Sequence, residues 1–450
     1  MRLNNIGYLA LFCSLFLFLY VLQPLSAEAA QQVLRSGVSL GHEYDSNINR
    51  QSADEQSEWT SSITPRLIYN RAELTNNFII EYAPSVVHSY HTDNERIDQY
   101  LQARYDSSLT QKWLVYMQDT FVLDEDPYAD PVADGTNSQI NDKNETIQVS
   151  DRRGRNRYWT NNFSTGSRLE YARQSFARLG YQYQVFDNKE AAFSDFVRHS
   201  PSMSILHSMN HQWDSQFDYR FTKGDFDEGE DLASNTHRPS RDLKTHASDL
   251  YLYYKLKPLT TVFGRYGYSQ TKYDELPNDY YYHLISAGLN HQFSPTLNLG
   301  FEGGMSLLRM DNFSDHDAVQ LRIALTKAWE RNSWSLSADS GLDEQQFSGT
   351  DDQGLSRFWG VRTTYHHTFI KDLTGLVSLS YRDDTYLERI PEADEQRVQG
   401  DAMLTYSFAQ WYQIALRYSY INQDADFAFN QYNDHRVLLE FSVIKDLLKW

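Results

Sequence analysis

The chain has 450 residues, and its 60 acidic against 41 basic side chains give a formal net charge of -19. This charge argues against nucleic-acid binding, because a phosphate backbone requires clustered positive charge. Aromatic residues make up 14% of the chain, which excludes a disordered protein. Apolar residues reach only 40%, which is little material for two or three soluble cores.

The first thirty residues have the pattern of a secretory signal peptide. An apolar stretch runs from Leu9 to Leu22, and Ala27-Glu28-Ala29 matches the small-x-small cleavage pattern. We expect a signal peptide over residues 1–29 and a mature domain over 30–450. An uncleaved anchor is the alternative, but this stretch is shorter than the roughly 20 residues that a spanning helix needs. Cys13 is the only cysteine, so the exported chain would contain neither disulfides nor thiols.

Apolar and polar residues alternate with period two from about Ser36 to Lys445, which is typical of β-strands. In one segment Val398, Leu404 and Tyr406 share a face, and Arg397 and Asp401 lie on the other. Counting such segments predicts about twenty strands. They start near residues 36, 58, 75, 97, 112, 157, 176, 193, 211, 242, 260, 279, 297, 317, 332, 355, 373, 394, 412 and 432.

The connections between these segments alternate in length. Those after even-numbered segments are short, such as 71–74 and 258–259, whereas those after odd-numbered segments include the longer acidic stretches 125–156 and 225–241. Outer-membrane barrels have short periplasmic turns and longer extracellular loops. A soluble β-sandwich, the alternative, has shorter strands and no reason for this asymmetry. The sequence therefore predicts an all-β protein, a transmembrane antiparallel up-and-down β-barrel of about 18–20 strands in the bacterial outer membrane.

The first predicted strand and the start of the last one carry a family resemblance. The segment 37–48, which contains Tyr44-Asp45-Ser46-Asn47, resembles the opening of the bacterial outer-membrane family known as β-barrel porin 2, and Asp434-His435-Arg436-Val437 is similar to that family's last strand. Several members accompany exopolysaccharide synthesis and export genes, so the resemblance implies a porin-like or export-associated barrel. One departure is the C-terminus, where we expect Asp446 and Lys449 to interrupt the last strand.

The candidate functional residues are arginines that fall on the polar face of the predicted strands. One interpretation is ion pairing with carboxylates on the same face, which would make the interior rigid. The other is a ladder that guides an anionic solute, because guanidinium binds carboxylate and phosphate and keeps its charge. The pore-lining candidates are Arg66, Arg104, Arg168, Arg178, Arg220, Arg265, Arg322, Arg382, Arg397, Arg417 and Arg436.

Two loop features have alternative interpretations. The stretch 125–156 has two interpretations: it folds into the pore and narrows it, or it forms a solvated lid on the surface. Calcium binding at Asp124, Asp126 and Asp130 is conceivable, since hard cations take carboxylate oxygens, but the spacing is not that of an EF-hand. No His/Asp/Glu set has metal-ligand spacing, and we expect neither a metal nor a cofactor.

The sequence leaves three classes of function open. The first is a channel for a hydrophilic solute, with an anion-preferring lumen or a role in exopolysaccharide export, and with no enzyme activity. The second is a barrel hydrolase acting on lipid or polysaccharide, for which Ser202, Ser204, His207 and Ser208 are the candidates. The third is a structural or adhesive barrel closed by its loops. The expected partners are outer-membrane lipids and lipopolysaccharide, the barrel-assembly machinery and polysaccharide-export components, and no nucleic acid.

Overall fold

The computed structural model describes residues 31–126, 154–189, 195–227, 240–347, 354–388, 392–426 and 430–449. The predicted signal peptide and Trp450 lie outside these ranges. No helix in the described ranges is long and apolar enough to cross a membrane.

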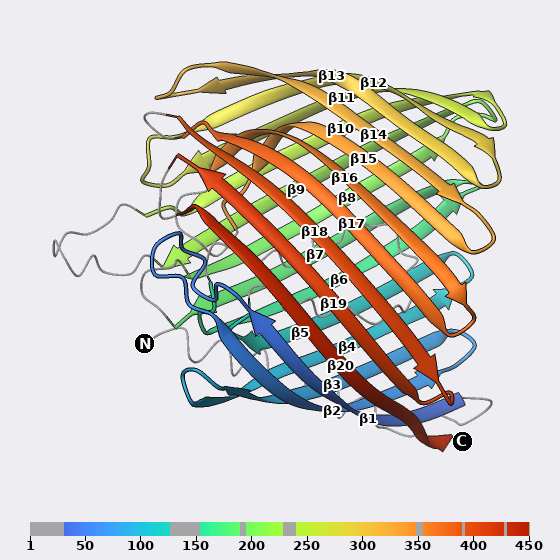
Figure 1. Cartoon of the computed structure of the whole chain (residues 1–450). Coiled ribbons are helices and arrows are strands. Elements are labelled where there is room, and N and C mark those ends of the chain that lie inside the picture. Colours follow the sequence, from blue (N-terminus) through green and yellow to red (C-terminus); the bar gives the residue numbers. More distant parts are fainter. Residues whose placement is uncertain are drawn as a thin grey trace.

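The described chain folds into a single closed antiparallel sheet of 20 strands (Figure 1). Each strand pairs with the next along the chain, and β20 pairs with β1. The strands are β1 Gln31–Asp45, β2 Glu58–Ala72, β3 Asn76–Ser89, β4 Asn94–Thr110, β5 Trp113–Asp124, β6 Tyr158–Ala172, β7 Ser175–Asn188, β8 Asp195–Ser208, β9 Trp213–Asp227, β10 Leu243–Lys257, β11 Thr260–Tyr273, β12 Tyr280–Ser294, β13 Leu297–Met310, β14 His316–Ala328, β15 Asn332–Glu344, β16 Leu355–Ile370, β17 Leu373–Tyr386, β18 Ala393–Phe408, β19 Tyr412–Ala425 and β20 Tyr432–Lys449.

The predicted barrel and its strand order are confirmed. Nearly all strands begin within three residues of the predicted starts, and the largest difference is at β1, which begins at Gln31 and not near Ser36. The alternation stops at residue 36, but the backbone of 31–35 continues to pair with β2. Strand β1 is therefore longer at its N-terminal end than the alternation of its side chains indicates.

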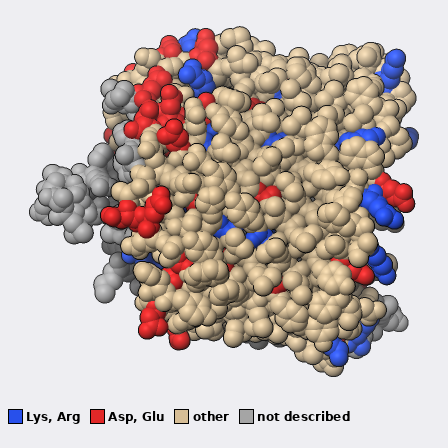
Figure 2. Space-filling model, viewed as in Figure 1, with Lys and Arg blue, Asp and Glu red and all other residues tan. Residues whose placement is uncertain are grey.

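The apolar face of each strand points outward. Leu404 of β18 and Leu416 of β19 stand opposite each other, and their side chains are 43% and 47% exposed. Thr405, the next residue of β18, points inward and is 9% exposed. An outward apolar face suits a barrel in hydrocarbon, where closure satisfies every backbone group. Figure 2 shows a broad band of the wall with few charged side chains.

The two ends of the barrel differ in connection length and charge. Connections from odd- to even-numbered strands lie at one end, here called the loop end, and the shorter ones lie at the opposite turn end (Figure 1). Aspartate and glutamate gather at the loop end, and lysine and arginine are frequent at the turn end (Figure 2). On the face that Figure 2 shows, most acidic side chains therefore lie at the loop end and not along the middle of the wall.

The C-terminal strand is longer than expected. β20 continues to Lys449 and pairs with β1, and the side chains of Arg35 and Asp446 form an ion pair at 3.1 Å. The prediction that Asp446 and Lys449 interrupt this strand was wrong. Both residues lie at the turn end, where a charged side chain remains hydrated, and the pairing with β1 continues past a register shift between the pairs Arg35–Asp446 and Leu34–Leu448.

Candidate functional site: the lumen and its loop-end mouth

The eleven candidate arginines all occupy strand positions that alternate with outward apolar residues. Arg417, for example, lies between Leu416 and Tyr418, which are exposed on the outer wall. The same alternation holds for the others, so their side chains project toward the lumen. These residues are Arg66, Arg104, Arg168, Arg178, Arg220, Arg265, Arg322, Arg382, Arg397, Arg417 and Arg436.

Most of these arginines have a carboxylate beside them. Some pairs cross between strands, as in Arg66 with Glu81 at 3.3 Å. Others run along one strand between residues i and i+2, as in Arg104 with Asp106 at 2.7 Å. Further pairs that involve a candidate arginine include Arg168–Glu170, Arg265–Asp249, Arg265–Glu302, Arg322–Glu302, Arg382–Asp343, Arg382–Asp384, Arg397–Glu395, Arg436–Glu43, Arg436–Asp45 and Arg436–Asp126.

Glu302 is the centre of a group of polar and charged side chains on the inner wall. Its buried carboxylate accepts a hydrogen bond from Ser286 at 2.6 Å and one from Arg265 at 3.3 Å, and Arg322 lies 4.0 Å away. Arg322 also stands directly opposite Asp339 on the next strand. The hydrogen bonds of Glu302 therefore join β11, β12 and β13, which makes that part of the inner wall rigid and polar, whereas Arg322 is held more loosely.

Four candidate arginines have neighbours other than carboxylates. The guanidinium groups of Arg168 and Arg178 both lie over the ring of Phe176, at 4.2 and 5.6 Å from its centroid. Arg220 stands opposite Ser202. Arg417 approaches the sulfur of Met403 at 3.9 Å. With Arg322, whose side chain is 45% exposed, Arg417 is a suitable residue to meet a solute in the lumen.

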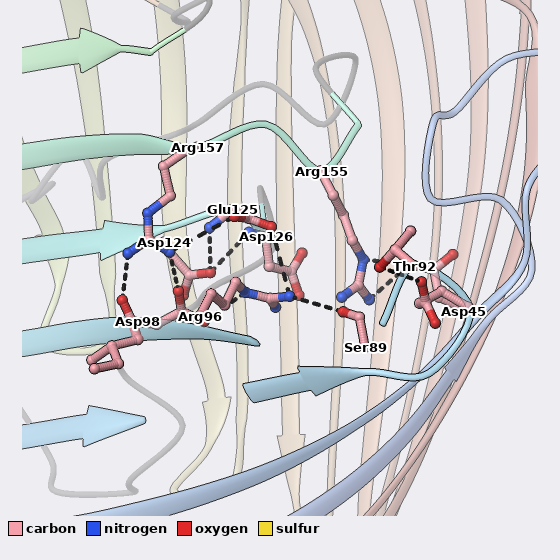
Figure 3. Close-up of polar contacts among 12 residues, drawn as sticks. Asp45, Ser89, Thr92, Arg96, Asp98, Asp124, Glu125, Asp126, Arg155 and Arg157 are labelled. Carbon is pink, nitrogen blue, oxygen red and sulfur yellow. Dashed lines mark hydrogen bonds and ion pairs between the residues drawn. The ribbon is translucent and has the colours of Figure 1, made fainter. Parts of the chain in front are cut away.

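The described ends of the β5–β6 connection, residues 125–126 and 154–157, are here called the loop stem. Arg155 pairs with Glu43 and donates to Asp45 at 2.9 Å, both on the inner face of β1. Arg436 of β20 contacts Asp126 at 2.5 Å and Glu43 at 2.9 Å. Figure 3 shows Arg155 pointing toward Asp45. The stem is thus joined to the barrel where the first and last strands meet.

The other side of the loop stem is bound to β4. Arg157 pairs with Asp98, and Arg96 donates to the same carboxylate at 3.1 Å and lies 3.6 Å from Glu125 (Figure 3). Burial lowers the pKa of Arg155, but its neighbouring carboxylates, those of Glu43 and Asp126, outweigh that effect and raise the pKa above its ordinary value. The guanidinium group of Arg155 therefore remains charged.

These contacts bear on the predicted behaviour of residues 125–156. The stem lies inside the mouth, but residues 127–153 are outside the described ranges, so the predicted narrowing by the whole stretch stays a prediction. The same holds for calcium, because Asp130 is not described. The Asp124 carboxylate accepts from two backbone N–H groups and the Asp126 carboxylate pairs with Arg436. No group of three or more His, Cys, Asp or Glu residues in the described ranges could hold a metal ion.

The β15–β16 loop also enters the mouth of the barrel, and this was not predicted from the sequence. In the β15–β16 loop, Gln346 donates to the hydroxyl of Tyr280 at 2.7 Å. Phe347 packs between Phe196 and Phe226, with ring centroids at 5.3 and 5.4 Å. These rings extend a buried apolar cluster at the loop end that includes Leu243, Tyr273, Leu308 and Leu355.

The seat of Phe347 depends on a glycine. A Cβ atom at Gly224 of β9 would stand 2.7 Å from the Phe347 ring, closer than real contacts allow. Glycine inside a strand often marks a close approach of another group, so Gly224 was the one sign in the sequence that a side chain lies against β9. Nearby, burial raises the pKa of Glu388, whose carboxylate accepts from the backbone N–H of Leu355 at 2.8 Å.

The serine and histidine candidates for hydrolysis do not come together. Ile205 is exposed on the outer wall, so His207 shares its outward face, while Ser202, Ser204 and Ser208 alternate to the lumen side. His207 contacts the hydroxyl of Tyr171, and Ser208 donates to Asp214 at 2.7 Å. A histidine on the opposite side of the wall cannot act as base for these hydroxyls.

No family model matches the sequence, and no curated protein matches it. Solved structures do match. The siderophore receptor PirA from Pseudomonas aeruginosa aligns with a TM-score of 0.52 and 10% identity over 91% of this chain and 80% of that one. A ferric enterobactin receptor (PfeA) mutant from Pseudomonas aeruginosa aligns with a TM-score of 0.54 and 8% identity over 92% and 81%. The chain is a bacterial outer-membrane β-barrel.

The outer membrane protein opdK from Pseudomonas aeruginosa aligns at 12% identity over 93% of this chain and 99% of that one, with a TM-score of 0.41. The likeness to the two receptors, at 10% and 8% identity, shows the barrel fold alone. Figures 1 and 2 agree with that fold, because the closed sheet carries an outer band with few charges. The loop end is accordingly extracellular, the turn end periplasmic, and the band between them faces lipid.

Proposed function

We propose that this barrel is a passive channel through which a hydrophilic anion diffuses. The observation that carries the proposal is the placement of an arginine on the lumen side of eleven strands. Guanidinium groups bind carboxylate and phosphate and remain charged at all physiological pH values. The channel would do no bond chemistry.

Ion pairing limits which arginines act on a solute. Arg265 and Arg382 are held by their own carboxylates and contribute rigidity. Arg322 and Arg417 have looser contacts, at 4.0 and 3.9 Å, and are the residues we assign to anion preference. Low-dielectric walls focus their field in the lumen, whereas acidic loop residues more than about 8 Å away are screened by salt.

A carbohydrate acid is the anion class that the lumen favours. Tyr251 and Tyr253 stack with centroids 5.7 Å apart, and Phe263 lies 5.7 Å from Tyr253. Tyr251 and Tyr253 alternate with the outward Leu250 and Leu252, and Phe263 stands directly opposite Tyr253, so all three face the lumen. Rings can stack on the apolar faces of sugars, and Arg322 and Arg417, the loosely held arginines, supply positive charge for an acidic group. This class agrees with the exopolysaccharide association that the family resemblance implies.

The proposal is tested by liposome swelling with the purified mature protein. Glucuronate, glucose and glucosamine are similar in size and differ in charge. We expect glucuronate to enter fastest and glucosamine slowest, with boiled protein as the inactive control. Faster entry of glucosamine would contradict anion preference. Absence of entry for all three would favour the structural or adhesive alternative.

A further inference from the structure

Three lysines form a row on the outer wall near the extracellular end. Lys244 of β10 stands directly opposite Lys223 of β9 on one side and Lys272 of β11 on the other. Each is an even number of residues from an outward residue of its own strand, Phe217, Leu250 or Tyr266, so it shares the outer face, and all three side chains are partly or fully exposed. Like charges directly opposite each other destabilise a sheet, so a bare row of this kind is unfavourable.

Two residues closer to the middle of the membrane, the same outer face carries an aromatic residue and a histidine. Phe221 stands opposite His246, whose Nδ1 lies 2.8 Å from the hydroxyl of Tyr219. One proton is shared in that contact, and the pair keeps one further N–H or O–H donor whichever tautomer the ring adopts. The neighbouring His199 makes the same contact with Tyr181 at 2.8 Å and stands directly opposite Lys223.

The Tyr–His contact recurs at the same height around the barrel. It joins Tyr266 with His283 at 2.8 Å and Tyr418 with His435 at 2.9 Å, each histidine being the fourth residue of its strand. Rings with one polar edge collect where a barrel wall passes from hydrocarbon into the headgroups. The lysine row begins two residues further out, about 7 Å along the strand, which is within the headgroup layer.

Aspartates adjoin the lysine row on its far side from the membrane. Asp225 pairs with Lys223 at 2.6 Å and Asp274 pairs with Lys244 at 2.7 Å. Asp242 accepts from the backbone N–H of Phe226. Lys272 has no ion pair within the described ranges. Moving outward, the wall therefore presents aromatic rings, then lysines, then aspartates, and the layer next to the lipid is positive.

We propose that the lysine row binds the phosphate groups of a glycolipid headgroup in the outer leaflet. Ammonium groups bind phosphate as point charges, and the adjoining Tyr–His pairs add neutral donors for phosphate or sugar oxygens. A bound phosphate supplies a counter-charge for Lys272, the member of the row that has no ion pair within the described ranges, while Lys223 and Lys244 also pair with Asp225 and Asp274. This site is on the outside of the wall and does not depend on what passes through the lumen.

The test measures lipid binding by the folded, detergent-purified barrel. Native mass spectrometry would titrate the mature protein with lipid A carrying two phosphates and with the same lipid after dephosphorylation. We expect tighter binding of the phosphorylated form. Changing Lys223, Lys244 and Lys272 together to Gln should weaken that binding about 10- to 100-fold, since each lysine near a charged membrane surface contributes about 1 kcal/mol.

The matched control changes three lysines at the periplasmic end, Lys257, Lys327 and Lys371, to Gln, which alters the net charge equally. Its affinity should stay within about twofold of the parent. If the triple variant folds poorly, as judged by its heat-dependent gel shift, Lys272→Gln alone should still lower the affinity. Equal binding of both lipid forms, or equal loss in the control, would overturn the proposal. Displacement of the lipid by millimolar inorganic phosphate would also overturn it, because the site would then prefer a free anion.

Discussion

Phe347, from the extracellular β15–β16 loop, lies over Gly224 in the wall of β9, where a Cβ atom would stand 2.7 Å from its ring. The loop therefore crosses into the mouth of the barrel and meets a wall that its own strands do not form. Arg198 covers the same ring at 4.9 Å, so Phe347 is enclosed by glycine, arginine and two phenylalanines.

Removing this ring should widen the mouth. Phe347→Ala deletes the side chain that fills the space over Gly224, and we expect single-channel conductance in a planar bilayer to rise by about 1.5- to 2-fold, since pore diameter governs conduction. Phe301→Ala, on the lipid-facing side of β13, is the control and should leave conductance unchanged. Equal conductance of Phe347→Ala and the parent would show that the narrowest point lies elsewhere.

The two faces of the wall should differ in their tolerance of charge. Leu416→Arg places a cation in hydrocarbon at a cost of roughly 2–4 kcal/mol near the bilayer midplane. Gln399→Arg places the same charge in the lumen, where Asp401, now 3.1 Å from the amide, can pair with it. The folded fraction, read as the band that shifts on boiling, should fall only for Leu416→Arg. Similar assembly of the two variants would contradict the assignment of the faces.

Arg155 should contribute far more to stability than an exposed lumen arginine. Arg155→Met leaves Glu43 and Asp45 buried with fewer compensating charges, which should lower the free energy of unfolding by roughly 3 kcal/mol. Arg168→Met breaks the solvated pair with Glu170 and should cost less than about 1 kcal/mol. Denaturant unfolding from lipid vesicles measures both. A smaller loss for Arg155→Met than for Arg168→Met would mean that the loop stem is not held by this contact.

The buried carboxyl of Glu388 predicts a pH-dependent stability. Burial raises its pKa, so the folded barrel prefers the protonated form, and its stability falls as pH rises from the ordinary glutamate pKa through the raised one. Glu388→Gln removes that penalty while keeping an oxygen for the Leu355 N–H group. We expect the variant to melt at a higher temperature than the parent at pH 8 and at a similar temperature at pH 4. A lower melting temperature at pH 8 would show that the charged form is stabilising.

The strands were predictable because their signal is local. Alternation along 397–408 or 412–420 requires only neighbouring residues, and the long and short connections then give the topology. The β20 extension was mispredicted because charge at Asp446 says little about backbone pairing with β1. Contacts such as Arg155 with Asp45 or Phe347 with Gly224 join residues far apart in the sequence. No period in the chain specifies those partners, so only the fold identifies them.

Alternation predicts the face on which the lumen arginines lie, but it does not predict their partners. Alternation gives the face and not the rotamer, so it could not tell that Arg104 turns along its own strand to Asp106 or that Arg322 stays half exposed. Ion pairing decides how much positive charge is left in the lumen to attract anions. The alternation pattern does not contain that information.

Ion selectivity is the most direct test of the channel account. Reversal potentials measured across a planar bilayer under a KCl gradient should show preference for chloride in the parent. That preference should weaken in Arg322→Ser/Arg417→Ser, which removes the two loosely held arginines, and persist in Arg168→Ser, which removes one that is paired with Glu170. Preference for potassium in the parent, or no conductance at all, would contradict the account.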